Sequence, residues 1–329
     1  MRGRGRPGEA RVCGAARQVG RLRPIGDSLT LGTLEQRRRR AGYAALAPAL
    51  LILLLILAYP IVDSMLLSVQ ELRAAGGTFE GRFIGLSNYN ALLADGTFRA
   101  ALWATAYFTA IEVVAVVLLA LGVALLLVHP FGRFGIFRIV LLLPWAIAPV
   151  ANAVLWKWIL HANYGILNTL LTGLGLIERN VIWLGTPSLA LHTVLAVDVW
   201  KSVPFIAILL LAGLSKVPPV LYRAARLDGA NAWQQFLHIT LPQLQPTIAV
   251  AVILQTLWSL RIFDLIFVLT KGGPADGTVM LNFLAYRTTF NFLDLGYGAA
   301  IANVIFAVSF VLALGYIWLL RPGLQKAGG

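Results

Sequence analysis

The chain has 329 residues, a formal net charge of +13, 59% hydrophobic residues and only 12% charged residues. With a mean hydropathy of +0.79 it has too few polar side chains to cover a soluble globule, so the composition excludes a soluble protein and predicts an integral membrane protein. Its apolar runs show no strand-like alternation, which favours membrane-spanning helices over a barrel.

The residues that build metal centres and active sites are scarce or scattered. Cys13 is the single cysteine, which excludes an intrachain disulfide and a cysteine-built metal site, and the four histidines lack metal-ligand spacing. The sequence has no nucleophile elbow, no phosphate-binding glycine loop and no HExxH motif. We therefore predict no catalytic residues, no metal and no cofactor.

Basic residues gather at the N-terminus, where residues 1–40 hold eleven arginines against three acidic residues. We interpret residues 1–36 as a disordered basic tail that contacts anionic lipid headgroups, in preference to a nucleic-acid-binding segment. A start further along the chain, at Val12, Val19, Leu29 or Leu31, is an alternative hypothesis for this region.

The first apolar run extends from Tyr43 to about Val69 and follows a basic stretch, as a signal peptide would. It exceeds the roughly 7–15 residues of a secretory apolar region and has no small-residue cleavage site, so we interpret it as a retained first span. We expect one membrane domain over residues 37–320 and a short C-terminal tail over 321–329. The further apolar runs bring the total to about six spans, and they cover residues 98–128, 136–160, 190–214, 246–270 and 297–320.

The segments between the spans alternate in charge. One set carries eleven Lys and Arg residues, whereas the other carries six together with most of the acidic residues. The positive-inside rule then places the first set, both termini and residues 221–242 in the cytoplasm. The first set comprises Arg37 to Arg40, Arg133, Arg138, Lys216, Arg223, Arg226, Arg321 and Lys326, and the second Arg73, Arg82, Arg99, Arg179, Lys271 and Arg287.

Residues 221–242, LYRAARLDGANAWQQFLHITLP, form an amphipathic and charged segment between two apolar runs. Apolar residues recur in it at helical spacing, which predicts two short helices hinged at Asp228 and Gly229. Gly229 allows a positive φ and a close approach of the two helices, and Pro242 is expected to end the second helix. We expect this segment to dock another protein.

The pattern Ala224-Ala225-x-x-Asp228-Gly229-Ala230, followed by Trp233, Phe236, Ile239 and Leu241-Pro242, resembles the cytoplasmic coupling motif of ABC-importer permeases. The resemblance covers about residues 37–320 and points to the carbohydrate-uptake branch, the maltose- and glycerol-phosphate-type permeases. It implies an all-α integral membrane protein with the type I ABC importer permease (MetI-like) fold and a cytoplasmic coupling helix. Five stretches carry it further: FIGLSNYNALL (83–93), FRIVLLLPWAIAPVANAVLWKWI (137–159), DVWKSVPFIAILLLAGLSKVP (198–218), FDLIFVLTKGGP (263–274) and FLDLGYGAAIANVIF (292–306).

The resemblance implies a permease subunit of an ATP-driven, binding-protein-dependent sugar importer in a bacterial cytoplasmic (inner) membrane, with a disaccharide or oligosaccharide such as maltose or trehalose as cargo. It also implies a second permease subunit, two ATP-binding cassette ATPase subunits and an extracytoplasmic sugar-binding protein, and no nucleic acid. Arg223 departs from the motif, which usually has Glu, so the facing ATPase surface is expected to be altered or acidic. The implied ATPase-coupling residues are Arg223, Ala224, Ala225, Asp228, Gly229, Ala230, Trp233, Phe236, Leu241 and Pro242.

Ionisable residues within spans are candidates for a substrate site, because such residues usually face a cavity or a partner. Asp198 and Lys201, like Arg261 and Asp264, lie three positions apart and could instead form intrahelical ion pairs, while Glu112 and Lys157 are isolated. The resemblance to a maltose-type permease implies substrate contacts, although Asp198 replaces an Asn and Phe205 a Tyr, so the substrate does not carry over. The implied contacts are Asp198, Lys201, Ser202, Phe205, Gln255, Trp258, Ser259 and Ile262.

Three alternative functions stay open. The first is an importer of the same class for glycerol-3-phosphate, which Lys201 and Arg261 would attract and Asp198 would repel. The second is a stand-alone ion-coupled secondary carrier, which requires inverted repeats or broken helices that the sequence does not reveal. The third, a membrane-bound enzyme, lacks a visible catalytic constellation. In the favoured reading, the binding protein docks near residues 70–97, 161–189 and 271–296.

Overall fold

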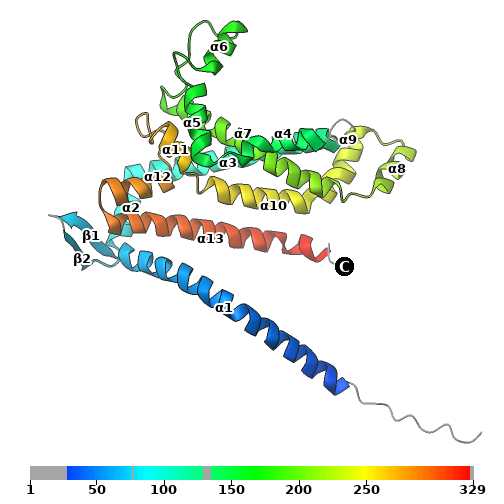
Figure 1. Cartoon of the computed structure of the whole chain (residues 1–329), viewed down its shortest axis with the longest axis horizontal. Coiled ribbons are helices and arrows are strands. Elements are labelled where there is room, and N and C mark those ends of the chain that lie inside the picture. The colour runs from blue at the N-terminus through cyan, green and yellow to red at the C-terminus, as the bar shows by residue number, and fades with distance from the viewer. Residues whose placement is uncertain (1–27, 76–77, 129–134, 327–329) are drawn as a thin grey trace, which may run out of the picture. The chain divides into compact units, whose positions relative to one another are not determined.

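The computed structural model describes residues 28–326 except 76–77 and 129–134, and the predictions for residues 1–27 and 327–329 lie outside the described residues. The chain divides after Pro60 into two parts, each of which is described by itself. The structure is mainly helical, which confirms the predicted fold class (Figure 1).

The first part consists of the N-terminal portion of helix α1 (Ser28–Ser68). The helix includes residues 28–36, which the sequence analysis assigns to the tail. Its apolar side chains are exposed all round, with Leu54 and Ile56 each 65% exposed. A helix that is apolar on every face is suited to a lipid environment rather than to water.

The second part is a helical bundle with one β-hairpin that the sequence analysis does not predict. The strands of the hairpin, β1 (Gln70–Ala75) and β2 (Thr78–Phe83), pair antiparallel, with Gln70 opposite Phe83. The helical elements that follow are α2 (Ser87–Ala94), α3 (Gly96–Val128), α4 (Gly135–Ala146), α5 (Pro149–Ile159), α6 (Ile166–Gly173), α7 (Pro187–Leu214), α8 (Pro219–Leu227), α9 (Ala232–Gln235), η2 (Phe236–Thr240), α10 (Leu241–Ser259), α11 (Asp264–Leu269), α12 (Leu281–Tyr286), η3 (Arg287–Asn291) and α13 (Leu295–Lys326).

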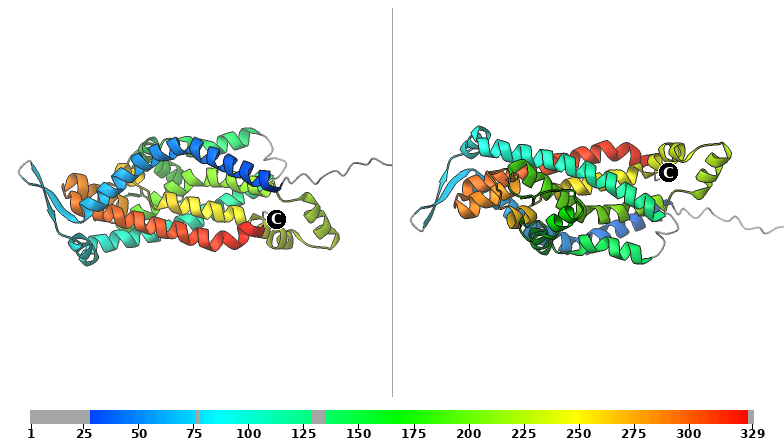
Figure 2. Two further views of the ribbon diagram at one scale, coloured as in Figure 1. Left: turned by 90° about the horizontal axis from the view of Figure 1, so that it is seen from below. Right: turned by 90° about the horizontal axis from the view of Figure 1, so that it is seen from above.

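Helices α3, α7 and α10 pack against one another and form the centre of the bundle (Figure 2). Small side chains line these contacts, including Ala120 and Ala124 of α3, both fully buried. At Gly213 of α7 an added Cβ would lie 2.6 Å from the Thr247 hydroxyl of α10. Small residues let helix backbones approach closely, and close packing is the main attraction between helices in lipid.

Two of the predicted spans are broken. The span expected at 136–160 consists of α4 and α5, which meet at an angle of 96°. Pro149 begins α5 and lacks an N–H, and the residue before it, Ala148, is forced into an extended conformation with ψ 140°. The helix of the span expected at 246–270 ends at Ser259, and the four residues 260–263 separate it from α11.

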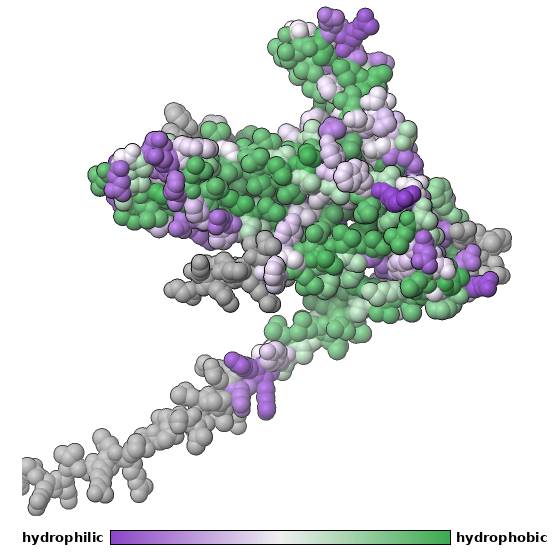
Figure 3. All heavy atoms as spheres, turned by 180° about the vertical axis from the view of Figure 1, so that it is seen from behind, coloured by the Kyte–Doolittle hydropathy of each residue, from purple (hydrophilic) through white to green (hydrophobic). Residues whose placement is uncertain are grey.

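Five described helices are long and apolar enough to cross a membrane, and the bent pair of α4 and α5 raises this number to six if it forms one span. In the second part, α8, α9 and the C-terminal end of α13 lie at one end of the bundle, while β1, β2 and α12 lie at the other (Figures 1 and 2). Apolar side chains cover much of the surface along the helices, and hydrophilic ones gather toward the ends (Figure 3). This distribution fits a bundle embedded in lipid.

The loop between α5 and α7 is held by one buried amide, that of Asn168, which is 2% exposed. Its Nδ2 donates to the carbonyls of Ala162 and Val181, and its Oδ1 accepts from the Val181 N–H and from Nε1 of Trp183. These bonds close the loop on itself around α6.

We predict that Asn168→Ala opens this loop, because it leaves several part-buried polar groups without a partner at a cost of about 2 kcal/mol. When the rate of cleavage is proportional to the fraction of molecules whose loop is open, that cost corresponds to roughly 30-fold faster tryptic cleavage after Arg179. Asn163→Ala, which removes an exposed amide from the same loop, is the control and should leave the rate unchanged. Equal cleavage rates for the two variants would contradict this role of Asn168.

Candidate functional site

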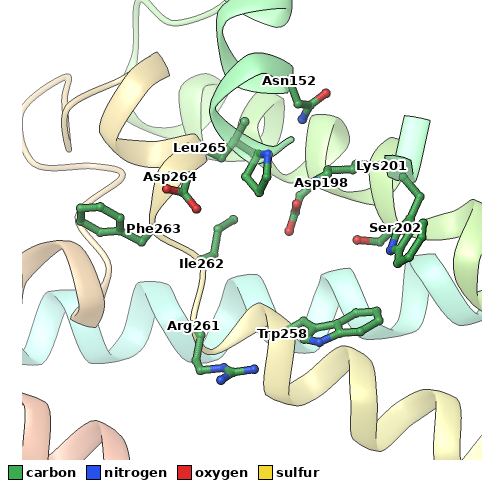
Figure 4. A pocket seen from close by; sticks show the side chains of 12 residues that line it. Asn152, Asp198, Lys201, Ser202, Trp258, Arg261, Ile262, Phe263, Asp264 and Leu265 are labelled. Atoms are coloured by element: carbon green, nitrogen blue, oxygen red, sulfur yellow. The ribbon is translucent and has the colours of Figure 1, made fainter. Parts of the chain in front are cut away.

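A cavity of about 510 Å³ lies where α5, α7 and the C-terminal end of α10 meet the segment before α11 (Figure 4). Its volume falls within the range of about 300–1,000 Å³ that is usual for small-molecule sites. Both breaks in the predicted spans border it. It is lined by Trp145, Pro149, Asn152, Asp198, Lys201, Ser202, Trp258, Arg261, Ile262, Phe263, Asp264 and Leu265.

Helix α7 contributes a polar stripe to the cavity. Asp198, Lys201 and Ser202 lie three and four positions apart, so helical geometry brings them to one face. The opposite wall comes from the end of α10, with Trp258, and from the non-helical residues that follow it (Figure 4).

Four charged residues border the cavity: Asp198, Lys201, Arg261 and Asp264. The intrahelical ion pairs considered from the sequence, Asp198 with Lys201 and Arg261 with Asp264, are not formed. An ion pair that does form lies elsewhere, between Arg287 and Asp276 at 2.7 Å. The Arg261 Nε donates to the Leu257 carbonyl at 3.2 Å, which anchors the side chain.

An aromatic cluster stiffens one side of the cavity. Phe205 stacks on Trp145 with ring centroids 4.9 Å apart and meets Trp258 edge-on at 5.2 Å. Phe205 itself does not line the cavity, but it supports the two Trp rings that do. These contacts restrict the Trp side chains and keep an aromatic wall in place.

Gln255 and Ser259 lie behind the cavity rather than on it, contrary to the contacts that the resemblance implies. Both are buried, with exposed fractions of 1% and 0%. Gln255 Nε2 donates to Glu112 Oε1 at 2.6 Å, and the Ser259 hydroxyl donates to that of Thr109 at 3.1 Å. They thus connect α10 to α3. Of the other six predicted contacts, Phe205 lies behind the two Trp rings, and the remaining five line the cavity, namely Asp198, Lys201, Ser202, Trp258 and Ile262.

The sequence analysis misses Trp145, Asn152 and Phe263 as cavity residues. A signal for the first two was present in the two prolines, Pro144 and Pro149, that bracket residues 145–148. Two prolines so close together in an apolar run indicate a break, and breaks at membrane depth occur where the backbone borders a cavity.

The second candidate site is the elbow, residues 219–240, which comprises α8, the turn around Gly229, α9 and η2. The turn closes α8 with two backbone bonds, from the Gly229 N–H to the Arg226 carbonyl and from the Ala230 N–H to the Ala225 carbonyl. This is the Schellman arrangement, in which the residue at the Gly229 position is left-handed. Gly229 has φ +81°, as the sequence analysis predicts.

A capping box starts the second helix of the elbow. The Asn231 side chain accepts from the Gln234 N–H at 2.9 Å, and the Gln234 side chain accepts from the Asn231 N–H at the same distance. In addition, the Tyr222 and Thr240 hydroxyls lie 2.9 Å apart and tie α8 to η2. The elbow is therefore a defined structure rather than a loose loop.

Two details of the predicted elbow are wrong. An added Cβ at Gly229 would meet no atom within 4 Å, so this glycine serves the backbone conformation and not a close approach of the helices. Pro242 does not end the second helix, which continues from Ala232 to Ser259. The π-helical turn η2 precedes Pro242, and in it the Leu241 N–H bonds to the Phe236 carbonyl. This wider turn lets the helix continue although Pro242 has no N–H to donate.

The elbow leaves large apolar side chains uncovered. Leu227 is 89% exposed and Trp233 65% exposed, while Trp233 stacks on the half-buried Phe236 at 5.5 Å. Of the other predicted coupling residues, Arg223, Ala224 and Asp228 are exposed, and Ala225, Ala230 and Leu241 are half-buried. A hollow of about 400 Å³ lies between the two short helices and is lined by Ala225, Asp228, Gly229, Ala230, Gln234, Gln235, His238 and Ile239.

Comparison with known proteins gives consistent results. Residues 103–321 match the model of the family described as binding-protein-dependent transport system inner membrane component. The chain is 37% identical to the sulfoquinovosyl glycerol transport system permease protein SmoG of Agrobacterium fabrum over 84% of this chain and 89% of that protein. It is 35% identical to the trehalose/maltose transport system permease protein MalF of Thermococcus litoralis over 88% and 97% of the two chains.

Among solved structures, the chain shares its fold with a bacterial alginate ABC transporter in complex with an alginate pentasaccharide-bound periplasmic protein. The TM-score is 0.73 and the sequence identity 24%, over 88% of this chain and 96% of that one.

We predict that Gly229→Ala loosens the elbow, because a side chain with a Cβ disfavours the left-handed conformation by about 1 kcal/mol. That cost corresponds to roughly fivefold faster hydrogen exchange of the Ala230 N–H, which bonds to the Ala225 carbonyl. Gly122→Ala in α3 is the matched control, since a Cβ there also meets no atom within 4 Å but φ is not positive. Unchanged exchange in Gly229→Ala would show that the turn does not depend on the glycine.

Proposed function

This chain belongs to the family of binding-protein-dependent transport system inner membrane components, and we propose that it is a permease subunit of an ATP-driven sugar importer. The observation that carries the proposal is that a cavity suited to a sugar and an exposed docking elbow lie at the two ends of one continuous helix. That helix runs from Ala232 to Ser259.

The chemistry of the cavity favours a carbohydrate. The apolar face of a pyranose packs on an aromatic ring, and Trp258 offers such a ring. Sugar hydroxyls need both donors and acceptors, which Asn152, Asp198, Lys201 and Ser202 provide. The printed names of the relatives, which refer to trehalose, maltose and a sulfoquinovosyl glycerol, support this class of cargo. A disaccharide or oligosaccharide is the preferred cargo.

We assign the elbow to the docking of an ATPase subunit. Leu227 and Trp233 are too exposed for a free protein surface, and an apolar helix face of this kind fits a groove on a partner. ATP-driven movement of the partner would push on the elbow and, through α10, on Trp258. Arg223 is exposed on α8, so the surface that receives it is expected to be acidic.

The remaining partners follow from the same assignment. The positive-inside rule orients the elbow and both termini toward the cytoplasm. Two ATPase subunits hydrolyse ATP, and a second permease subunit completes the pathway. An extracytoplasmic binding protein delivers the sugar near residues 70–97, 161–189 and 271–296. The related alginate transporter was solved with a periplasmic protein, which supports a partner of this kind.

The alternatives are less favoured. Asp198 and Asp264 oppose the phosphate of glycerol-3-phosphate, although Lys201 and Arg261 would attract it. A secondary carrier requires broken helices, and the structure has two, α4–α5 and α10–α11, so this criterion does not separate the two functions. Family membership argues against it instead, since this family works with a binding protein.

We predict that Trp258→Ala lowers sugar uptake per ATP hydrolysed by the reconstituted complex about tenfold, because the sugar loses its stacking surface. Trp258→Phe should retain most of the uptake. Trp318→Ala, which removes a 72% exposed Trp of α13, is the control and should have no effect. Similar losses in Trp258→Ala and Trp318→Ala would exclude a specific role of the cavity.

We predict that Leu227→Asp weakens association with the ATPase subunits at least tenfold, because a charge replaces an apolar anchor, at a cost of roughly 1.4 kcal/mol or more. Co-purification and ATP hydrolysis in the assembled complex measure this effect. Leu93→Asp, which changes an equally apolar side chain, 71% exposed, on α2 at the opposite end of the bundle, is the control for co-purification without the binding protein and should leave association with the ATPase subunits unchanged. If Leu227→Asp binds and stimulates the ATPase as the unchanged protein does, the elbow is not the docking site.

A further inference from the structure

Glu112 of α3 is the one fully buried carboxyl group among the described residues, with an exposed fraction of 0%. Its Oε1 accepts from Nε2 of Gln255 at 2.6 Å, and its Oε2 has no hydrogen-bond partner within the described chain. A buried carboxylate with a single neutral donor is strongly unfavourable, because ionised groups need charge partners or several donors away from water. The surroundings of Glu112 therefore require a further contact.

That contact is available from Asp198 of α7. The carboxyl groups of Glu112 and Asp198 lie within hydrogen-bonding reach of each other. Two ionised carboxylates in contact in a buried site repel, so such a pair retains a proton between its oxygens. The pair differs in environment, because Asp198 lines the cavity whereas Glu112 does not (Figure 4).

We propose that Glu112 is a positioning residue that donates a shared proton to Asp198 and aims the second oxygen of Asp198 at the sugar. Asp198 borders the polar cavity together with Lys201, whereas Glu112 is fully buried beside the neutral amide of Gln255, so the negative charge is better accommodated on Asp198 and the proton on Glu112. Asp198 can then accept a hydrogen bond from a sugar hydroxyl. This inference rests on the proposed function in one respect, because it takes a sugar as the ligand of Asp198. The proton shared by Glu112 and Asp198 does not depend on the proposed function.

Among the described residues, no other charged group near Glu112 and Asp198 is suited to donate the proton to Asp198. On α7 the charged groups are Asp198 and Lys201, and Arg261 and Asp264 border the cavity beyond α10. Helix α10 places two side chains near Glu112, those of Gln255 and Ser259, and neither of them titrates. The described residues also hold no group of three acidic, His or Cys side chains that could bind a metal ion, so a proton is the preferred occupant of the pair.

The direct test is infrared spectroscopy of the detergent-solubilised protein at neutral pH, which detects the C=O stretch of a protonated carboxylic acid. Glu112→Gln and Glu112→Leu should both lack the band that the unchanged protein shows. Glu112→Gln keeps an N–H donor for Asp198 and a similar shape, so it serves as the conservative variant. An identical band in the unchanged protein and in Glu112→Gln would overturn the shared proton.

Transport by the reconstituted complex gives the second test, with uptake expressed per ATP hydrolysed from about pH 6 to about pH 10. Uptake by the unchanged protein should fall as alkaline pH removes the proton, while uptake by Glu112→Gln should stay at the neutral-pH level throughout. Glu112→Leu should lower uptake about tenfold, and it should lower it no further in the Asp198→Asn background, because Glu112 acts through Asp198. Additive losses would mean that Glu112 has a separate, structural role.

The outcomes separate this inference from the proposed function. If the unchanged complex moves no sugar, the proposed function fails while the infrared band still tests the proton. If the unchanged complex transports sugar and Glu112→Gln shows the same decline at alkaline pH, the proposed function stands and the role of Glu112 is wrong. Co-purification with the ATPase subunits, which no Glu112 variant should change, checks that each variant is folded.

Discussion

A chain in hydrocarbon must pair its backbone polar groups with one another, and this constraint explains where the structure departs from continuous helix. Within its predicted spans, the second part of the chain leaves helical geometry at residues 147–148 and 260–263. Trp145 and Pro149, on either side of the first break, and residues 261–263 of the second line the cavity. At the second break the N–H groups of residues 260–262 bond to carbonyls of the last turn of α10, and the Leu260 carbonyl accepts from Asn282 Nδ2, so the interrupted backbone finds partners within the protein. Asn152 and Asp264 lie shortly after these breaks and line the cavity. The chain therefore contributes polar side chains to the binding surface at the places where its helices are interrupted.

Hydropathy was sufficient to predict the number of spans and the mainly helical fold, because apolar runs of this length have few alternative structures. It could not predict the bend between α4 and α5, since residues 136–160 stay apolar on both sides of it. The elbow was recognisable because its polar and apolar residues follow a helical period in an otherwise apolar chain. Its capping box at Asn231 was overlooked, although the Asn and Gln three positions apart were visible in the sequence.

The substrate contacts show a second limit. Gln255 and Ser259 are polar residues on α10, as is expected of cavity residues, but they face α3. Which face of a buried helix meets the cavity depends on neighbours distant in sequence, and the partner of Gln255 lies 143 positions away. For the same reason the sequence indicated that Glu112 was unusual without indicating what it contacts. The β-hairpin was missed because its strands are short and pair only with each other.

The packing of α7 against α10 determines how a push on the elbow could reach the cavity. Near the elbow, Gly213 packs so closely against Thr247 and Leu244 that an added Cβ would lie within 2.9 Å of both side chains. Tight interfaces of this kind move as rigid units rather than deforming gradually. Residues 260–263 have no such helical frame, and they begin two positions after Trp258. Displacement of the elbow would therefore carry α7 and α10 together and concentrate the change in backbone angles at this break. Because Asp198 travels with α7 while Asp264 lies beyond the break, the two acidic sides of the cavity would change their separation, which is the movement needed to bind and release a sugar.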